Sequence, residues 1–292
     1  MEIIRARDMG FCFGVRRAVE MMEEAAQQIG PLTTLGSTVH NRQVVQKLRE
    51  KGIDVVASLD EVSGRPVAVT AHGVGPQVKA ALEQLGVPVV DTTCPIVTRS
   101  QQWAKRLAEE GFAVIVFGDP EHKEVRGVLG WAGGRGIAVA SEADLDRLPD
   151  DLPSRIAVLS QTTHTEARFA AFVRHLFETR MERISELRVI NTLCNATTSQ
   201  QAAAQELARQ VDLMIVIGGR DSANTRHLAE VCREEGVDTH HIETADEIDP
   251  AWLEGRQRVG VTAGASTPDF AVDEAIARLE EMAARLEAKP RA

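Results

Sequence analysis

Three cysteines occupy the same place in a repeated pattern. Cys12, Cys94 and Cys194 lie in "GFCFGV", "TTCPIV" and "NTLCNATT", each directly before a segment with helical periodicity. The next strand-closing glycine follows 24 residues later in all three cases, at Gly36, Gly118 and Gly218. A helix N-terminus stabilises a thiolate, which is the form of cysteine that binds metal. The equal spacing therefore favours three convergent metal ligands over three unrelated buried side chains.

Three thiolates suit two kinds of metal centre. One is a zinc ion whose fourth position stays open for water or substrate. The other is a cubane iron–sulfur cluster with one iron that has no protein ligand. The spacing alone does not choose between them. Cys232 differs, because it lies within the helical pattern "HLAEVCREEG" and at no repeated position, so we interpret it as a packing residue.

Polar loops follow six apolar strands of the repeated pattern. They carry neutral hydrogen-bonding groups and one carboxylate, namely His40, Asn41, His72, His122, Glu124, Thr162, Thr163, Ser222, Asn224 and Ser266. Glycines beside them, such as Gly73 and Gly264, allow backbone N–H groups to approach a ligand closely. We therefore expect a small anion, such as a phosphorylated molecule, to bind next to the metal.

Glu124 is the only carboxylate in this set of residues, and His122 lies two positions before it. A carboxyl group that loses its water in a closed site has a raised pKa and can act as a general acid. His122 is a candidate for relaying the proton. The alternative is that Glu124 is simply a favourable negative charge at the start of a helix.

Strands and helices alternate every 25 to 35 residues, which predicts parallel sheets and the α/β class. The pattern predicts three similar small α/β domains, arranged about a pseudo-threefold axis so that equivalent strand ends converge. The expected ranges are 1–94, 95–190 and 191–276, followed by a helix and tail over 277–292.

The composition argues against several classes of partner and location. The 292-residue chain has a formal net charge of −10, which argues against nucleic acid or an anionic membrane as its main partner. Its longest apolar runs are too short to span a bilayer, and residues 1–10 lack the apolar core of a signal peptide. We therefore expect a cytoplasmic protein, in which four scattered cysteines do not form a disulfide framework.

The motifs that carry these residues also resemble a known family. "GFCFGV", "VHNRQVV", "AHGV", "TTCPIV", "EHKEVRG", "SQTT", "NTLCNATTSQQ", "DSANT" and "VTAGASTPD" resemble those of the 4-hydroxy-3-methylbut-2-enyl diphosphate reductases, in the same order and from about residue 3 to residue 283. That family catalyses the last step of the non-mevalonate isoprenoid pathway. The resemblance implies a trefoil of three α/β domains around a central iron–sulfur (4Fe–4S) cluster.

The resemblance also implies a role for each site residue. Cys12, Cys94 and Cys194 match the cluster ligands, and the fourth iron would remain available to the substrate. Glu124 matches the proton donor, Thr162 the group that positions the substrate hydroxyl, and His122 another member of the active-site ring. The residues that match the diphosphate site are His40, His72, Ser222, Asn224 and Ser266. Ala223 departs from the hydroxyl or glycine of some relatives, so no role is transferred to it.

The implied reaction is the reductive dehydroxylation of 4-hydroxy-3-methylbut-2-enyl diphosphate to isopentenyl and dimethylallyl diphosphate. Two electrons would come from a ferredoxin or flavodoxin, because the sequence has no GxGxxG dinucleotide fingerprint. Two other functions fit the same residues: a zinc-dependent hydrolase or deaminase that uses Glu124, and an iron–sulfur redox sensor that binds a phosphorylated metabolite.

Overall fold

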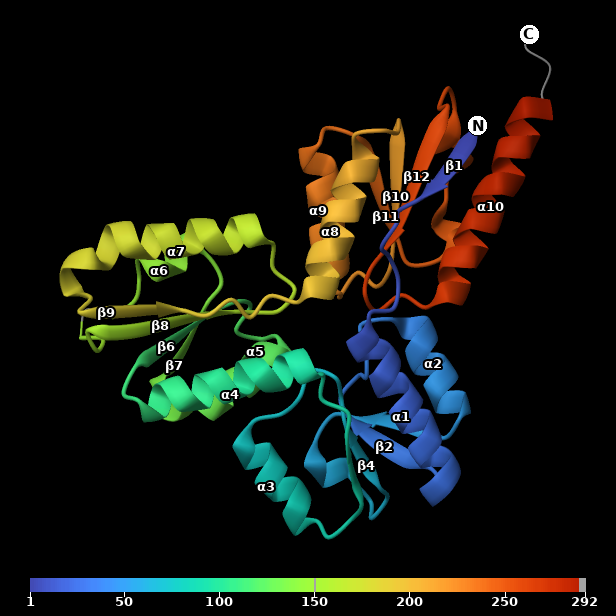
Figure 1. The fold of residues 1–292 in the computed structure, drawn as a ribbon. Coiled ribbons are helices and arrows are strands. Elements are labelled where there is room, and N and C mark those ends of the chain that lie inside the picture. The colour runs from blue at the N-terminus through green and yellow to red at the C-terminus, as the bar shows by residue number, and fades with distance from the viewer. Residues whose placement is uncertain (150, 289–292) are drawn as a thin grey trace. The chain divides into compact units, whose positions relative to one another are not determined.

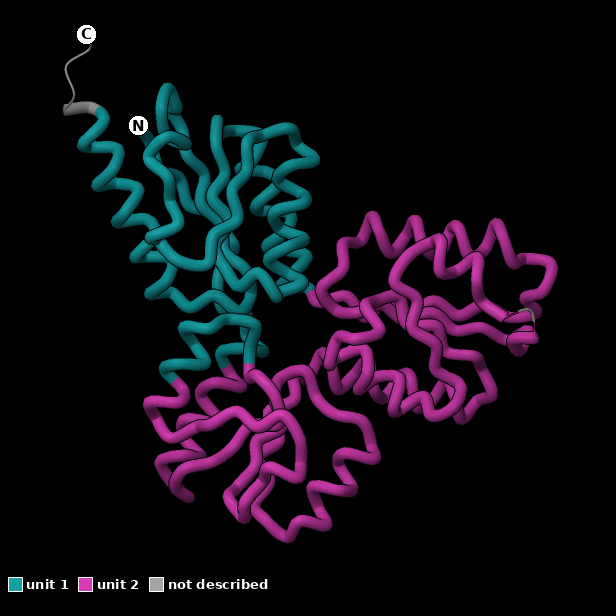
Figure 2. Tube along the Cα trace, turned by 180° about the vertical axis from the view of Figure 1, so that it is seen from behind, with its two compact units in different colours: residues 1–16, 39–47, 195–292 teal, residues 17–38, 48–194 magenta. Residues whose placement is uncertain are grey.

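The computed structural model describes residues 1–149 and 151–288 (Figure 1). The chain divides into two compact units, coloured separately in Figure 2. Unit 1 comprises Met1–Arg16, Val39–Lys47 and the chain from Asn195 onward. Unit 2 comprises Arg17–Thr38 and Leu48–Cys194. No helix among the described residues is both long enough and apolar enough to cross a membrane.

Unit 2 contains two four-stranded parallel sheets. The first has the spatial order β3 (Ile53–Val56), β2 (Leu32–Leu35), β4 (Val67–Val69) and β5 (Val89–Asp91). The second has the order β7 (Gly136–Val139), β6 (Ala113–Phe117), β8 (Arg155–Ser160) and β9 (Glu186–Val189). In both sheets the strand that comes first in the chain lies second in space, so the two repeats share one topology.

Unit 1 contains the third parallel sheet, with the order β11 (Asp238–Ile242), β10 (Leu213–Ile217), β12 (Arg258–Ala263) and β1 (Glu2–Arg5). This is the same topology, but its last strand comes from the N-terminus of the chain. The prediction that residues 1–94 form one repeat is wrong for these residues, because Ile3 pairs with Val259. β5, which precedes Cys94, is the edge strand of the first sheet, and β9, which precedes Cys194, is the edge strand of the second. β1, which precedes Cys12, has the same place in the third sheet.

The helices follow the same plan. They are α1 (Phe13–Ile29), α2 (Arg42–Glu50), α3 (Pro76–Gln84), α4 (Pro95–Glu109), α5 (Lys123–Ala132), α6 (Glu142–Leu145), α7 (Glu166–Arg180), α8 (Asn195–Ala208), α9 (Ala223–Glu234) and α10 (Asp269–Ala288). Single 3-10 turns span Leu59–Glu61, Gly133–Arg135, Met181–Arg183, Ala245–Glu247 and Pro250–Leu253. Gly30 and Gly111 follow α1 and α4 with φ of 86° and 90°, which is the conformation expected of a helix-terminating glycine.

Helices cover both faces of two of the sheets. In unit 1, α10 packs against one face of β10 and β12, and α8 and α9 pack against the other (Figure 1). In unit 2, α7 covers one face of β6 and β8, while α4 and α5 cover the other. Strands buried on both faces are apolar throughout, as "AVIVF" and "LMIVI" are. The sheets therefore expose only their strand ends to ligands.

The predicted C-terminal helix is longer than its sequence pattern indicated. α10 begins at Asp269, whereas the prediction began it at residue 277, and its buried residues Val272, Ile276 and Leu279 belong to the core of unit 1. The prediction missed this first part because "STPDFAV" has no clear apolar periodicity. The expected tail over 289–292 lies outside the described residues.

Candidate functional site

The three predicted ligand cysteines share one backbone setting. The amide N–H of each donates to the carbonyl of the loop that follows β4, β8 or β12. These bonds join Cys94 to Ala71, Cys194 to Thr162 and Cys12 to Ala265, at 2.9–3.1 Å. α1, α4 and α8 each begin directly after one of these cysteines. The structure thus confirms that the three thiols occupy equivalent positions at helix starts.

The accessibility of the thiols separates these three cysteines from the fourth. Cys12, Cys94 and Cys194 are partly exposed, whereas Cys232 is 0% exposed in the core between α8, α9 and β10. Burial raises the pKa of Cys232 to about 12, so this thiol stays protonated. No disulfide joins any of the four cysteines in the described part of the chain. Cys232 is a packing residue, as the sequence predicts.

Cys94 and Cys194 lie in the same unit as Glu124. Burial raises the pKa of Cys94, backbone N–H groups of Ile96 and Val97 oppose that rise, and the negative charges of Cys194 and Glu124 add to it. A bound cation would compensate for the repulsion among these groups. Cys12 lies in the other unit, so the convergence of all three thiols on one centre stays a prediction.

Glu124 is buried and paired with Thr162. Its carboxyl group accepts two hydrogen bonds, from the Thr162 backbone N–H to Oε1 at 2.7 Å and from the Thr162 hydroxyl to Oε2 at 2.8 Å. The Glu124 side chain is only 3% exposed, and burial raises its pKa although the two bonds from Thr162 oppose the shift. The carboxyl group therefore holds its proton more firmly than an exposed glutamate, which is the property that a general acid needs.

Glu124 should also make the stability of the protein pH-dependent. Because the folded-state pKa is raised, the folded chain keeps a proton that the unfolded chain releases above its ordinary pKa of 4.5. The free energy of unfolding of the wild type should therefore fall relative to that of Glu124→Gln as the pH rises through the window between the two pKa values. Urea denaturation of both proteins from about pH 4 to pH 8 measures the difference. Parallel pH profiles would contradict the raised pKa.

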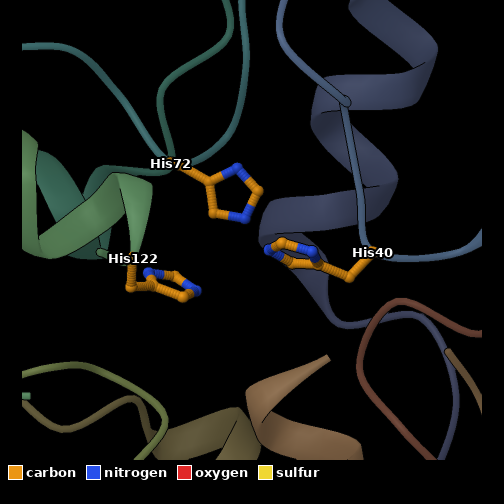
Figure 3. A group of neighbouring side chains, drawn as sticks. All are labelled: His40, His72 and His122. Atoms are coloured by element: carbon orange, nitrogen blue, oxygen red, sulfur yellow. The ribbon is translucent and has the colours of Figure 1, made fainter. Parts of the chain in front are cut away.

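His122 stands beside this pair and caps α5. Its Nδ1 accepts the backbone N–H of Glu124 at 3.2 Å, so the neutral ring carries its proton on Nε2. The ring of His72 meets that of His122 edge to face, with centroids 5.5 Å apart (Figure 3). Nδ1 of His72 lies 3.2 Å from the Thr70 hydroxyl. The third ring labelled in Figure 3, His40, belongs to unit 1.

The remaining predicted anion-binding residues gather in unit 1. Ser222 caps α9 and accepts the Thr225 amide, and the Ser266 hydroxyl lies 3.5 Å from that of Ser222. His40 lies against the loop after β10, because a Cβ on Gly219 would be 2.0 Å from the His40 carbonyl oxygen. The backbone of His40 can pack there only because that position is glycine.

Asn224 is the most deeply placed of these side chains, at 3% exposed. Its Nδ2 donates to Gln200 Oε1 at 3.2 Å, and its buried Oδ1 has no hydrogen-bond partner in the described part of the chain. In this orientation the free end of the amide is an acceptor, so an anion could be bound only if the group turned to present its NH₂ and gave up its bond to Gln200.

Gln200 contacts a predicted site residue, and the sequence reasoning did not single it out. It is buried in α8, where its Oε1 holds Asn224 and its Nε2 donates to the Gly10 carbonyl at 2.7 Å. It thereby joins Asn224, a predicted anion-binding residue, to the loop that carries Cys12. The available signal was a pair of glutamines within the alanine-rich helix "NATTSQQAAAQELA".

The starts of α5 and α9 are equivalent in structure, although their sequence motifs differ. His122 and Ser222 are helix N-caps, and Glu124 and Asn224 each follow two residues later. In the first repeat the N-cap is Asn41, whose Oδ1 accepts the Val44 amide at 3.1 Å. His40 therefore precedes the position that corresponds to His122. The second residue of the helix is thus an acid, Glu124, in the second repeat and an amide, Asn224, in the third.

Comparison with known proteins agrees with this arrangement. The family model described as "LytB protein" matches residues 3–280. The 4-hydroxy-3-methylbut-2-enyl diphosphate reductase of Dehalococcoides mccartyi (strain CBDB1) is 46% identical over 97% of this chain and 99% of the relative, and that of Geobacter metallireducens is 44% identical over 97% and 98%.

Two solved structures are similar over nearly the whole chain. One is an (E)-4-hydroxy-3-methyl-but-2-enyl diphosphate reductase described as the terminal enzyme of the non-mevalonate pathway, with 37% identity, a TM-score of 0.71 and coverage of 96% of this chain and 100% of that one. The other is the E-1-hydroxy-2-methyl-but-2-enyl-4-diphosphate reductase of Plasmodium falciparum, with 26% identity, a TM-score of 0.86 and coverage of 99% and 88%. With its three parallel sheets and its equivalent cysteines, the chain belongs to the LytB family, the family of these 4-hydroxy-3-methylbut-2-enyl diphosphate reductases.

Proposed function

We propose that this chain reduces 4-hydroxy-3-methylbut-2-enyl diphosphate to isopentenyl and dimethylallyl diphosphate, as the last step of the non-mevalonate pathway. Its membership of the LytB family supports the proposal, and so does the buried pair of Glu124 and Thr162, which provides an acid for a departing hydroxyl group. Anaerobic turnover with a strong artificial electron donor tests the proposal directly. Purified chain with a full complement of iron that fails to reduce this substrate would contradict it.

The chemistry of the cysteines fits a 4Fe–4S cluster held by Cys12, Cys94 and Cys194. All three are partly exposed and start a helix, and soft thiolate ligands favour iron–sulfur clusters or zinc over hard cations. When bound, such a cluster supplies electrons and a Lewis-acidic iron. A ferredoxin or flavodoxin is the proposed source of the electrons, because the sequence has no dinucleotide fingerprint.

The chain's own residues bind the substrate and handle its protons. Glu124 delivers a proton to the oxygen of the leaving hydroxyl group, and the Thr162 hydroxyl orients both the acid and that oxygen. His122, two residues before Glu124, is the proposed relay of protons to it. Its Nδ1 accepts the Glu124 backbone N–H, so its exchangeable proton is on Nε2. Cysteines that form no disulfide in the described chain suit a reducing compartment, which supports the proposed cytoplasmic location.

The proposed diphosphate site consists of His40, His72, Ser222, Asn224 and Ser266. Asn224→Ala should raise KM for the substrate about 10- to 100-fold, because a charge-assisted hydrogen bond of roughly 1.5–3 kcal/mol is lost. The kcat should change little, since this amide does not act on the hydroxyl group. Steady-state kinetics under anaerobic conditions measure both constants.

Inorganic diphosphate provides a second measurement of the same site. It should raise the thermal midpoint of the wild type more than that of Asn224→Ala, since at one concentration a ligand that binds the folded state more tightly stabilises it more. Equal protection of the two proteins would place the diphosphate elsewhere.

A further inference from the structure

Unit 2 contains a cavity that the proposed reaction does not use. Its volume is about 430 Å³, and it lies between the end of β2, the start of α3 and the first turns of α5. Thr70 and Gly73, which line it, come from the loop that carries His72. Of the residues proposed to bind the metal or the substrate, none is among its described lining residues. The cavity is therefore separate from the candidate active site in its lining.

The charge of this cavity is unusual for an acidic protein. Lys123 and Arg126, one helical turn apart on α5, both line it, and no carboxylate does so among the described residues. Neither side chain forms an ion pair or a hydrogen bond within the part of the chain that the structure describes. The whole chain carries a net charge of −10, so two unpaired cations facing one cavity indicate an anionic occupant.

The side chain of Lys123 packs closely against one wall of this cavity. Its ammonium group lies against the backbone of Gly36, where a Cβ would be only 2.5 Å from Nζ. Gly36 also has φ of 77°, a conformation that favours glycine. The side chain is partly buried, and burial lowers the pKa of Lys123. A partly desolvated cation without a partner is unfavourable, and a bound anion would offset that cost.

The rest of the lining indicates what kind of anion fits. α3 starts at the cavity with Gly75 as its N-cap, so no side chain caps its first turn. Leu35, Leu59 and Val78 supply aliphatic surface on the same walls. Phosphate oxygens suit the cations and the helix start, whereas a short hydrocarbon group suits the aliphatic side chains.

We propose that this cavity is a second ligand site, which binds an organic phosphate with a short aliphatic portion. Lys123 and Arg126 contact the phosphate group, and Leu35, Leu59 and Val78 contact the hydrocarbon. The site goes beyond the proposed reaction, and its occupancy requires neither turnover nor an electron donor.

Isothermal titration of the full-length, iron-loaded protein with n-butyl phosphate tests the proposal. Lys123→Gln and Arg126→Gln should each weaken binding about tenfold, as expected for the loss of one charge-assisted hydrogen bond. Lys79→Gln is the matched control, because Lys79 is an exposed cation on α3 that does not line the cavity. Asn224→Ala, which alters the proposed substrate site, should bind n-butyl phosphate as the wild type does. Inorganic phosphate should bind more weakly than n-butyl phosphate, since it makes no contact with the aliphatic side chains.

A residue-specific measurement complements the titration. Lys123 should be acetylated readily by a limiting amount of acetic anhydride, because a lowered pKa leaves more of the reactive amine, and n-butyl phosphate should protect it while Lys79 reacts equally with and without the ligand. Wild-type protein that binds no n-butyl phosphate would overturn the proposal. So would affinity that survives in both Lys123→Gln and Arg126→Gln, or that disappears in Asn224→Ala.

Discussion

Glu124→Gln should lower kcat about 10²- to 10⁴-fold, which is the range typical for the loss of a general acid. Glutamine keeps the shape of the buried side chain: its Oε1 can accept the Thr162 amide, and its NH₂ can donate to the Thr162 hydroxyl. It has no acidic proton to give to the leaving hydroxyl group. KM should change much less than kcat, because the acid acts on the hydroxyl group and not on the diphosphate.

Single-turnover reduction with a strong artificial donor measures this effect without a limit from electron delivery. Glu121→Gln is the matched control, because Glu121 lies in the turn just before α5 and is exposed, and it should retain wild-type kcat. Thr162→Val should show a milder defect, since it removes the positioning hydroxyl and leaves the acid. If Glu124→Gln turned over at the wild-type rate, the proton would come from another group, with His122 the next candidate.

Cys12→Ser, Cys94→Ser and Cys194→Ser should each lose the metal centre, so that bound iron falls from about four atoms per chain to near zero. A serine hydroxyl is a poor substitute for a soft thiolate, and three protein ligands leave none to spare. Iron, zinc and sulfide contents after anaerobic purification are the measurement. If the wild-type protein contained zinc and no sulfide, the metal centre would be a zinc ion and not an iron–sulfur cluster.

Cys232 provides the control for this experiment. Cys232→Ser and Cys232→Ala should both keep the iron, because this thiol lies in the hydrophobic core and belongs to no repeated position. The alanine variant is included because it places no hydroxyl group in that core. Circular dichroism of all five variants separates loss of metal from loss of fold. Iron as low in Cys232→Ala as in the three ligand variants, with the fold intact, would contradict the assignment.

Local sequence patterns were sufficient to predict much of the fold around the candidate site. The distance of 24 residues from each cysteine to the next strand-closing glycine spans one helix and one strand, which are local structures with regular geometry. This is why the α/β class, the repeated topology and the different character of Cys232 could be predicted and are confirmed. The placement of the three repeats about one axis, and with it the trefoil, remains a prediction.

Other features depended on which strands become neighbours. β1 joins β12 although more than 250 residues separate them in the chain, and no local signal distinguishes that pairing from one within the first repeat. The bonds from Thr162 to Glu124 join residues 38 positions apart, and they form because β6 and β8 are adjacent. Gln200 acquired a role only when α8 brought it between Asn224 and Gly10.

Local sequence is sufficient to predict which chemical groups stand at strand ends and helix starts, because propensity, capping and periodicity act over a few residues. Which of these groups come into contact depends on the tertiary structure. It buried the Glu124 carboxyl group beside Thr162 and left the Asn224 amide oxygen without a partner in the described chain. It also brought Lys123 against Gly36. Burial and hydrogen bonding depend on sheet order and side-chain packing, and these set the pKa of a group and its need for a ligand.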